Sequence, residues 1–233
     1  LTKCPVGLDQ NNHLKLTGEH EILNEWIQGI EDRDNKIIKE FQTTFHSSFF
    51  EFFLFALFKE AGFKIDFSKN RPDFIITNPL PMYIEAVVSN IKQGGRKENT
   101  RTLDDILEMI EPPYLQDDFY GKLDESIVRH SNSISGKNDK YLNEYSKLDY
   151  IDEDVPYVIA LSGYDQVNYG NQFYYPMMAL LYGNYYDIKT DGYEKRDFIV
   201  KPNTNSEIPI GIFHDKKMEH ISAIIFSSVI TLG

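Results

Sequence analysis

Apolar residues near the N-terminus follow the spacing of a helix, and a helical pattern resumes over a longer stretch further on. Five of them share one helix face: Ile22, Leu23, Trp26, Ile27 and Ile30. They predict a helix after about 20 polar, irregular residues. A second helical pattern extends from about Asp34 to Ala61, and the next residue, Gly62, is typical of helix C-termini.

The second half of this longer helix is apolar on nearly every side. Its phenylalanines are Phe45, Phe49, Phe50, Phe52, Phe53, Phe55 and Phe58. A helix of that kind is buried on nearly every side. Glu51, in the middle of the run, is therefore a charge that needs an explanation.

Strand patterns follow this helix and then give way to a polar segment. Three extended segments are expected at Phe63–Phe67, Asp73–Thr77 and Met82–Ser89. The last two are joined by the turn sequence at residues 78–81, so we expect an antiparallel hairpin. The polar, glycine-containing residues 90–100 predict a loop.

The second half of the chain adds helices, a buried strand and a hairpin. Residues 101–147 are predicted to be mostly helical, with breaks near Pro112-Pro113 and near Gly136. Val155–Leu161 is a continuous apolar run typical of a buried strand. The remaining expected elements are a helix at Phe173–Tyr182, a hairpin at Asp187–Val200 turning at Asp191-Gly192, and a last strand at Ile221–Ile230.

These elements predict an α/β protein with a mixed central β-sheet flanked by helices. No repeat and no linker-like segment divides the 233 residues, so we expect a single domain over residues 1–233. Within it, residues 1–33 form an N-terminal arm and helix, and residues 45–161 form the core. Residues 162–233 form a C-terminal extension with the hairpin and the final strand.

Composition and charge restrict the function classes. Apolar residues make up 41% of the chain, enough for a sizeable core, and the one cysteine, Cys4, excludes an intrachain disulfide or a cysteine-based metal site. No signal-peptide pattern and no apolar run of bilayer-spanning length is visible, so we expect a cytoplasmic protein without membrane contact. The formal net charge of −12 argues against non-specific nucleic-acid binding but allows a local basic cleft.

Glu85 is the first candidate for chemistry. It lies in the strand pattern Met82–Ser89, where alternation puts Tyr83, Glu85 and Val87 on one face. An ionised carboxylate in a half-buried strand is costly unless it is paired, binds a cation or faces a cleft. The plainer interpretation is a glutamate on the solvent face of an edge strand.

Asp73 and Glu51 favour a cation site. Asp73 follows Pro72 at the start of the strand that pairs with the Glu85 strand, so both carboxylates are expected at one end of the sheet. Close carboxylates repel each other, and a cation or a shared proton relieves the repulsion. Taken singly, Asp73 is an ordinary turn residue and Glu51 lies on a solvated stripe of its helix. Together, the three supply the hard oxygen ligands that suit Mg²⁺ or Mn²⁺.

In this order, the residues resemble the core of the PD-(D/E)xK nucleases. The matching features are a helix carrying Glu51, then Pro72-Asp73 on one strand of a hairpin and Glu85 on the next. The lysine-rich sequence at residues 136–141 and the buried strand after it are similar to features of several bacterial members. The resemblance covers residues 45–161.

The resemblance implies a restriction-endonuclease-like core that hydrolyses phosphodiester bonds in DNA. It also implies that Asp73, Glu85 and the backbone carbonyl of Ala86 hold Mg²⁺ or Mn²⁺. Glu51 would bind the ion directly or through water.

One position departs from the family pattern. Val87 lies where the family has its lysine, two residues after Glu85. Valine can neither orient a water nor stabilise charge on a phosphate. We expect a displaced lysine to take this role, with Lys137 as the first candidate, Lys140 as the second and Lys92 as the third. The alternative for each is a solvated surface residue.

Two functions remain open at this point. The first is a metal-dependent endonuclease with Glu51, Asp73, Glu85 and Lys137 as catalytic residues; a homodimer would suit cleavage of two strands. The second is an inactive nuclease-fold protein that binds nucleic acid or a partner protein, which Val87 and the charge of −12 favour. The three carboxylates favour the first, because an inactive scaffold has no physical reason to hold mutually repelling charges together.

Overall fold

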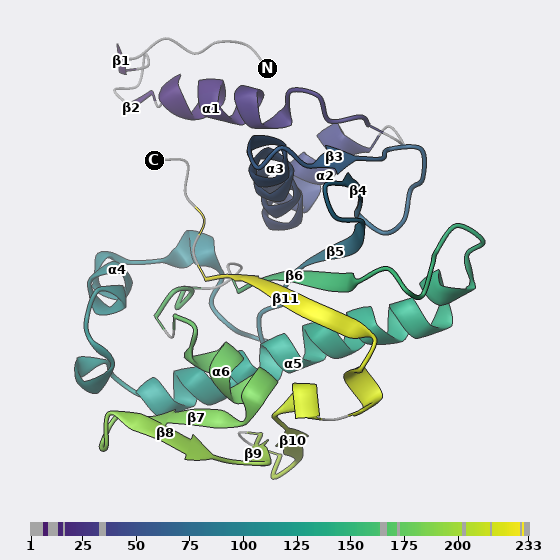
Figure 1. Cartoon of the computed structure of the whole chain (residues 1–233). Helices are drawn as coiled ribbons and strands as arrows, with labels where there is room; N and C mark the ends of the chain where they lie inside the picture. The colour runs from purple at the N-terminus through teal and green to yellow at the C-terminus, as the bar shows by residue number, and fades with distance from the viewer. Residues whose placement is uncertain are drawn as a thin grey trace.

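A mixed five-stranded sheet lies at the centre of the molecule (Figure 1). The computed structural model describes residues 7–8, 14–15, 17–32, 36–163, 167–171, 173–201, 204–214, 216–228 and 230. The strands, in spatial order, are β11 (Ile221–Ser227), β6 (Tyr157–Ser162), β5 (Met82–Val88), β4 (Phe74–Asn78) and β3 (Lys64–Ile65). β3, β4 and β5 form an antiparallel meander, whereas β5, β6 and β11 run parallel. The predicted mixed α/β sheet flanked by helices is confirmed.

Helices cover both faces of this sheet (Figure 1). On one face lies α3 (Phe45–Glu60), against which α1 (Thr17–Ile27) and α2 (Ile37–Thr43) pack. On the other face lies α5 (Phe119–Asn143), which belongs to the connection from β5 to the parallel strand β6.

Smaller elements complete the described structure. The other helices are α4 (Leu103–Met109) and α6 (Tyr175–Tyr182). The 3-10 turns are η1 (Glu98–Thr100), η2 (Pro113–Leu115), η3 (Tyr145–Lys147), η4 (Ile212–His214) and η5 (Lys216–Met218). Three two-stranded ribbons pair β1 (Gly7–Leu8) with β2 (Leu14–Lys15), β7 (Asn184–Asp187) with β8 (Gly192–Lys195), and β9 (Phe198–Val200) with β10 (Glu207–Pro209).

The alternation predicted for β5 divides the core into two apolar clusters. Ile84 and Ala86 join the cluster under α3, which includes Phe50. Tyr83 points to the opposite face and joins the cluster under α5, which includes Leu123. β5 lies between β6 and β4, so it is not an edge strand. Four consecutive residues in its middle are buried, so side chains on both of its faces are covered.

The long helix expected between about Asp34 and Ala61 is two helices, with the break at Thr44. Thr44 has φ −129° and ψ 51°, outside the helical region. The hydroxyl groups of Thr43 and Thr44 donate to carbonyls one turn earlier, at 2.8 and 2.9 Å, and such bonds compete with a regular helix. The expected start near Asp34 lies outside the described residues, and Gly62, just past the end of α3, has the predicted left-handed conformation with φ 78°.

Two further predictions need correction. α5 runs through Gly136 without a break, since one glycine costs a helix only about 1 kcal/mol and buried neighbours such as Ile134 stabilise it. The C-terminal hairpin pairs β7 with β8, so its first strand ends at Asp187 instead of beginning there. Phe198–Val200 pairs with β10 instead. Cys4 and most of the N-terminal arm lie outside the described residues.

In the part of the chain that the structure describes, no helix combines the length and apolar character needed to cross a membrane.

Candidate active site

Glu85 lies at the middle of the central sheet. The backbone of β5 pairs with β6 on one side and β4 on the other, and the Glu85 side chain has no accessible surface. The interpretation of Glu85 as a solvated residue on an edge strand is therefore wrong. A buried carboxylate must have compensating partners.

Asp73 lies opposite Glu85, directly before β4. β4 and β5 pair Phe74 with Ile84, and continuing that antiparallel register by one residue sets Asp73 against Glu85. The Asp73 side chain extends the hydrogen bonding between the two strands, because its Oδ2 accepts the backbone N–H of Ala86 at 2.8 Å. The hairpin thus fixes one carboxylate against the strand that carries the other.

Glu51 comes from α3 and lines the same cavity as Asp73 and Glu85. Its side chain is half-buried, between the buried residues Phe50 and Phe52. A cavity of about 300 Å³ collects the predicted site residues. Its walls include Glu51, Asp73, Glu85, Ala86, Lys137 and Lys140.

Two lysines of α5 contact Glu85 from the face of the sheet that α5 covers, opposite the face that α3 covers. The Nζ atoms of Lys137 and Lys140 donate to Glu85 Oε1 at 2.7 and 2.9 Å. Their spacing of three residues puts both on one face of the helix. Lys92 lies elsewhere, because its ammonium pairs with Glu125. The lysines that contact Glu85 are thus the first two of the three considered.

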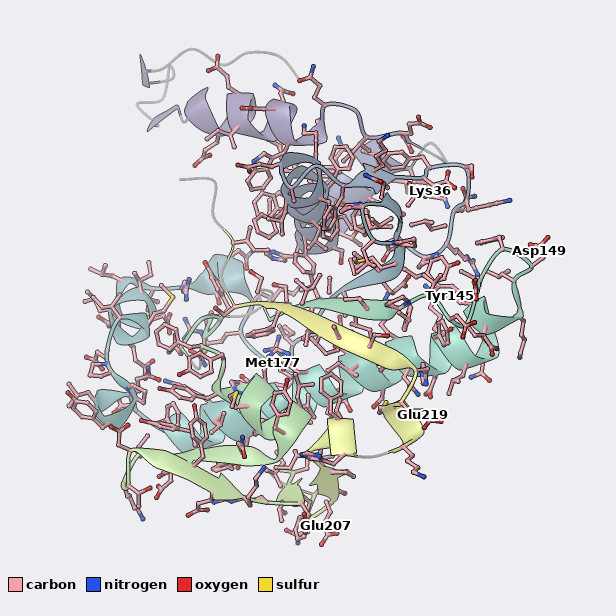
Figure 2. All side chains as sticks on the ribbon, in the orientation of Figure 1. Lys36, Tyr145, Asp149, Met177, Glu207 and Glu219 are labelled. Atoms are coloured by element: carbon pink, nitrogen blue, oxygen red, sulfur yellow. The ribbon has the colours of Figure 1, made fainter. Side chains whose placement is uncertain are left out.

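Tyr145 is a site residue that the sequence analysis missed. Its hydroxyl lies 3.1 Å from both carboxylate oxygens of Glu85. It belongs to η3, beside the C-terminal end of α5, where it is labelled in Figure 2. An aromatic residue after a helix is usually part of the core, so its sequence context gave no signal of this contact. Val87 packs half-buried against the α5 cluster.

Burial and charge push the pKa values of the three carboxyl groups apart. Burial raises the pKa of Glu51 to about 8, and the negative charge of Asp73 contributes. Burial raises the pKa of Asp73 to about 6, with Glu85 adding to the effect. Burial also opposes ionisation of Glu85, but the charges and hydrogen bonds of Lys137 and Lys140 outweigh it and hold its pKa below the usual value. The lysines thus keep Glu85 ionised, whereas Glu51 and Asp73 hold their protons to higher pH than usual.

The carboxyl groups suit a cation, which would displace their protons, although no ligand set is already assembled. Among the described residues, no three His, Cys, Asp or Glu side chains converge as metal ligands. The donors along the cavity are nevertheless carboxylate and carbonyl oxygens, the type that Mg²⁺ and Mn²⁺ prefer. A divalent ion between Glu51 and Asp73 would favour their ionised forms and offset part of the burial that raises both pKa values.

Comparisons of the chain with protein-family models, with curated proteins and with solved structures found no match. The chemistry of this cavity therefore follows from its own side chains. Strongly perturbed carboxyl groups beside lysines, in one cavity, are typical of functional sites.

Proposed function

We propose that this protein is a metal-dependent nuclease that hydrolyses phosphodiester bonds in DNA. One observation carries the proposal: the Lys137 ammonium lies 2.7 Å from Glu85 in the cavity that Glu51 and Asp73 also line. Lys137 supplies, from another element, the positive charge that Val87 lacks. The order of a helix, three antiparallel strands, a helix and a parallel strand also agrees with the resemblance noted in the sequence.

Each residue has a role in this proposal. Asp73, Glu85 and the carbonyl of Ala86 would hold Mg²⁺ or Mn²⁺, and Glu51 would bind it directly or through water. The bound ion would supply an activated water and polarise the scissile phosphate. Lys137 would orient that water or offset the charge that develops on the phosphate. Water adds across the P–O bond, which leaves a phosphate on one product and a hydroxyl on the other.

The burial of Glu85 restricts how a metal ion can reach it. Because this carboxylate has no accessible surface, an ion reaches it only after a neighbouring side chain moves. Lys140 is the more exposed of the two lysines, with 35% of its side chain accessible against 20% for Lys137. We expect Lys140 to swing out first and Lys137 to stay in the site.

The same contacts favour a second candidate function. Lys137, Lys140 and Tyr145 together compensate the charge of Glu85 without any metal. An inactive protein that keeps this closed network as a structural unit would bind nucleic acid or a partner protein without cleaving anything. The two functions differ in whether the protein cleaves DNA at all.

The test is cleavage of plasmid DNA and of single-stranded DNA with Mg²⁺ or Mn²⁺ by the wild-type protein and by the Asp73→Asn variant. Asparagine keeps an oxygen that can accept the Ala86 N–H but removes the charge. We expect the variant to fold normally and to lose at least about 100-fold in cleavage rate.

The control is Asp149→Asn, an exposed aspartate on a loop, labelled at the edge of the molecule in Figure 2. This variant should cleave like the wild type. Cleavage that survives Asp73→Asn would mean that a contaminant or another site is responsible. A wild-type protein that cleaves neither plasmid nor single-stranded DNA would favour the inactive alternative.

A further inference from the structure

A second, larger cavity opens from the carboxylate cavity and follows α5. Its volume is about 1030 Å³, and it shares Val87, Asn90, Lys137 and Lys140 with the smaller cavity. Residues of α5 line it at intervals of three or four positions from Gly121 to Lys140. Since a helix rises 1.5 Å per residue, this face of α5 is about 29 Å long. The carboxylates therefore lie at one end of an extended groove.

The groove is basic although the protein is acidic. Six of its lining residues are Lys or Arg and two are Asp or Glu, a formal balance of +4. Including the three carboxylates of the smaller cavity, and Glu108, which forms an ion pair with Lys122, leaves a balance of zero, against −12 for the whole chain. The groove is thus far less negative than the rest of the surface, and its lysines attract a polyanion that the rest of the surface repels.

The cations of the groove are of two kinds. Arg129 is buried and donates to the carbonyls of Ser89 and Asn90, so it holds the segment that leaves β5. Lys92 is mostly exposed, and its ion pair with Glu125 is of the surface type that is worth little and exchanges readily. Lys92 can thus move from Glu125 to a phosphate at small cost.

Gly136 lies on this groove and has no explanation in the fold. It is exposed in the interior of α5, and a Cβ at this position would have no atom within 4 Å. Glycine at such a helix position costs about 0.5–1 kcal/mol relative to alanine. Gly121, also on the groove, is different: a Cβ there would collide with the Asp118 carboxylate that caps α5. Nothing in the part of the chain that the structure describes therefore accounts for a glycine at position 136.

We propose that the groove binds a single strand of nucleic acid whose backbone passes over Gly136 to reach the carboxylates. The missing side chain lets a phosphate approach the helix next to Lys137, and the polar side chains of Asn132 and Ser133 continue the path. A length of about 29 Å spans roughly four to eight nucleotides of one strand.

The groove also has two sides, which favours one strand over a duplex. α5 forms one side, and the segment after β5 together with Asn168 and Lys201 forms the other. A duplex of the same length occupies several times the volume of the groove. Cleavage of the bound strand rests on the proposed function, whereas binding of the strand does not.

The test measures binding of a fluorescein-labelled dodecamer of dT by anisotropy, in EDTA so that nothing is cleaved. Gly136→Ala should raise the thermal midpoint of the free protein, because alanine is the better helix former and meets no atom. Gly136→Phe should weaken binding of the strand at least tenfold, because the ring would fill its path. A dodecamer of rU tests whether RNA enters equally well, and a duplex of the same length should bind at least tenfold more weakly.

Gly18 provides the matched control. It is exposed on α1, and a Cβ there also meets no atom within 4 Å, so Gly18→Phe should bind the dodecamer like the wild type. Equal binding by Gly136→Phe and the wild type would overturn the proposed groove, as would a wild type that prefers the duplex or binds neither. If Gly136→Phe abolishes binding but the wild type cleaves nothing with Mg²⁺ or Mn²⁺, the groove stands and the proposed nuclease activity fails. If cleavage depends on Asp73 but not on Gly136, the activity stands and the groove fails.

Discussion

Glu85 shows how a buried charge can be stable in the middle of a sheet. Two ammonium groups and one hydroxyl contact its carboxylate, and these contacts offset the loss of water. The positive charge of Lys137 acts beyond Glu85, since it also lowers the pKa values of Glu51 and Asp73. Lys137 therefore stabilises the charged forms of all three carboxyl groups.

This position predicts that Lys137→Met removes hydrolysis. The variant keeps the length of the side chain but loses the charge, so we expect the cleavage rate to fall by about 100-fold or more. Lys140→Met should cost less, because Lys137 remains on Glu85. The measurement is the initial rate of DNA cleavage with Mg²⁺, together with the thermal midpoint of each variant.

Lys147→Met is the control for this prediction, since Lys147 is an exposed lysine of η3 outside both cavities. It should cleave like the wild type. Equal cleavage rates for Lys137→Met and Lys147→Met would remove Lys137 from the mechanism.

The raised pKa of Glu51 predicts an unusual dependence of stability on pH. With a pKa of about 8, the folded protein holds a proton that the unfolded chain releases near its ordinary value of 4.5. The resulting stabilisation is fully present below pH 4.5 and is lost as pH rises to 8. Asp73 acts in the same direction up to its pKa of about 6. In EDTA, the free energy of unfolding should therefore fall between pH 5 and 8.

The variant Glu51→Gln isolates this effect. It should be more stable than the wild type at pH 8, by something on the order of 2 kcal/mol, and the difference should shrink toward pH 5. Urea unfolding at several pH values measures it. A difference between the two proteins that stays constant with pH would mean that Glu51 is already ionised in the folded protein at pH 5.

At the scale of single residues, the sequence predicted most of the candidate site. Chain order and strand alternation were enough to select Glu51, Asp73 and Glu85, and all three line one cavity. Tyr145 was missed because its contact with Glu85 depends on where a short turn after α5 comes to lie. The preference for Lys137 came from its place on a helix, but its contact with Glu85 needed the packing of α5 against the sheet.

At the scale of elements, patterns of apolar residues predicted which segments form helices and strands, and the prolines predicted the break near Pro112-Pro113, but two other helix breaks were not predicted correctly. Thr44 interrupts the long helix because threonine hydroxyls compete for helix carbonyls, a local effect that the apolar pattern does not show. Gly136 was expected to interrupt α5 and does not. The buried face of α5 stabilises the helix by more than one glycine costs it.

Pairing between elements was predictable only where a short turn fixed it. The turn at residues 78–81 joins β4 to β5, so their antiparallel pairing followed from the sequence. The parallel position of β11 beside β6 did not, because about 60 residues separate the two strands and no local feature specifies their contact. The pairing of β9 with β10 was missed for another reason: only six residues separate the two strands, but no strand was expected at Glu207–Pro209.

At the scale of the whole molecule, two apolar clusters share one sheet. β5 and β6 contribute alternate residues to each cluster, so neither cluster can open without exposing strands that the other needs. Trp26, the single tryptophan, belongs to the α3 side, where its ring lies 5.7 Å from the rings of Phe49 and Phe53. Its fluorescence therefore reports one face of the sheet, while α5 dominates the helical signal on the other.

This arrangement predicts that the two faces unfold together. Leu123→Ala removes a fully buried side chain from the α5 cluster and should cost about 2–5 kcal/mol. Because the faces share β5 and β6, the midpoint of urea unfolding should shift equally by Trp26 fluorescence and by far-UV circular dichroism, although Trp26 lies on the opposite face. A Trp26 transition that stays in place while the circular dichroism shifts would show that α1 and α3 unfold separately. The cavity that Glu51 closes from α3 and Lys137 closes from α5 would then join two independent units, and its geometry would depend on their docking.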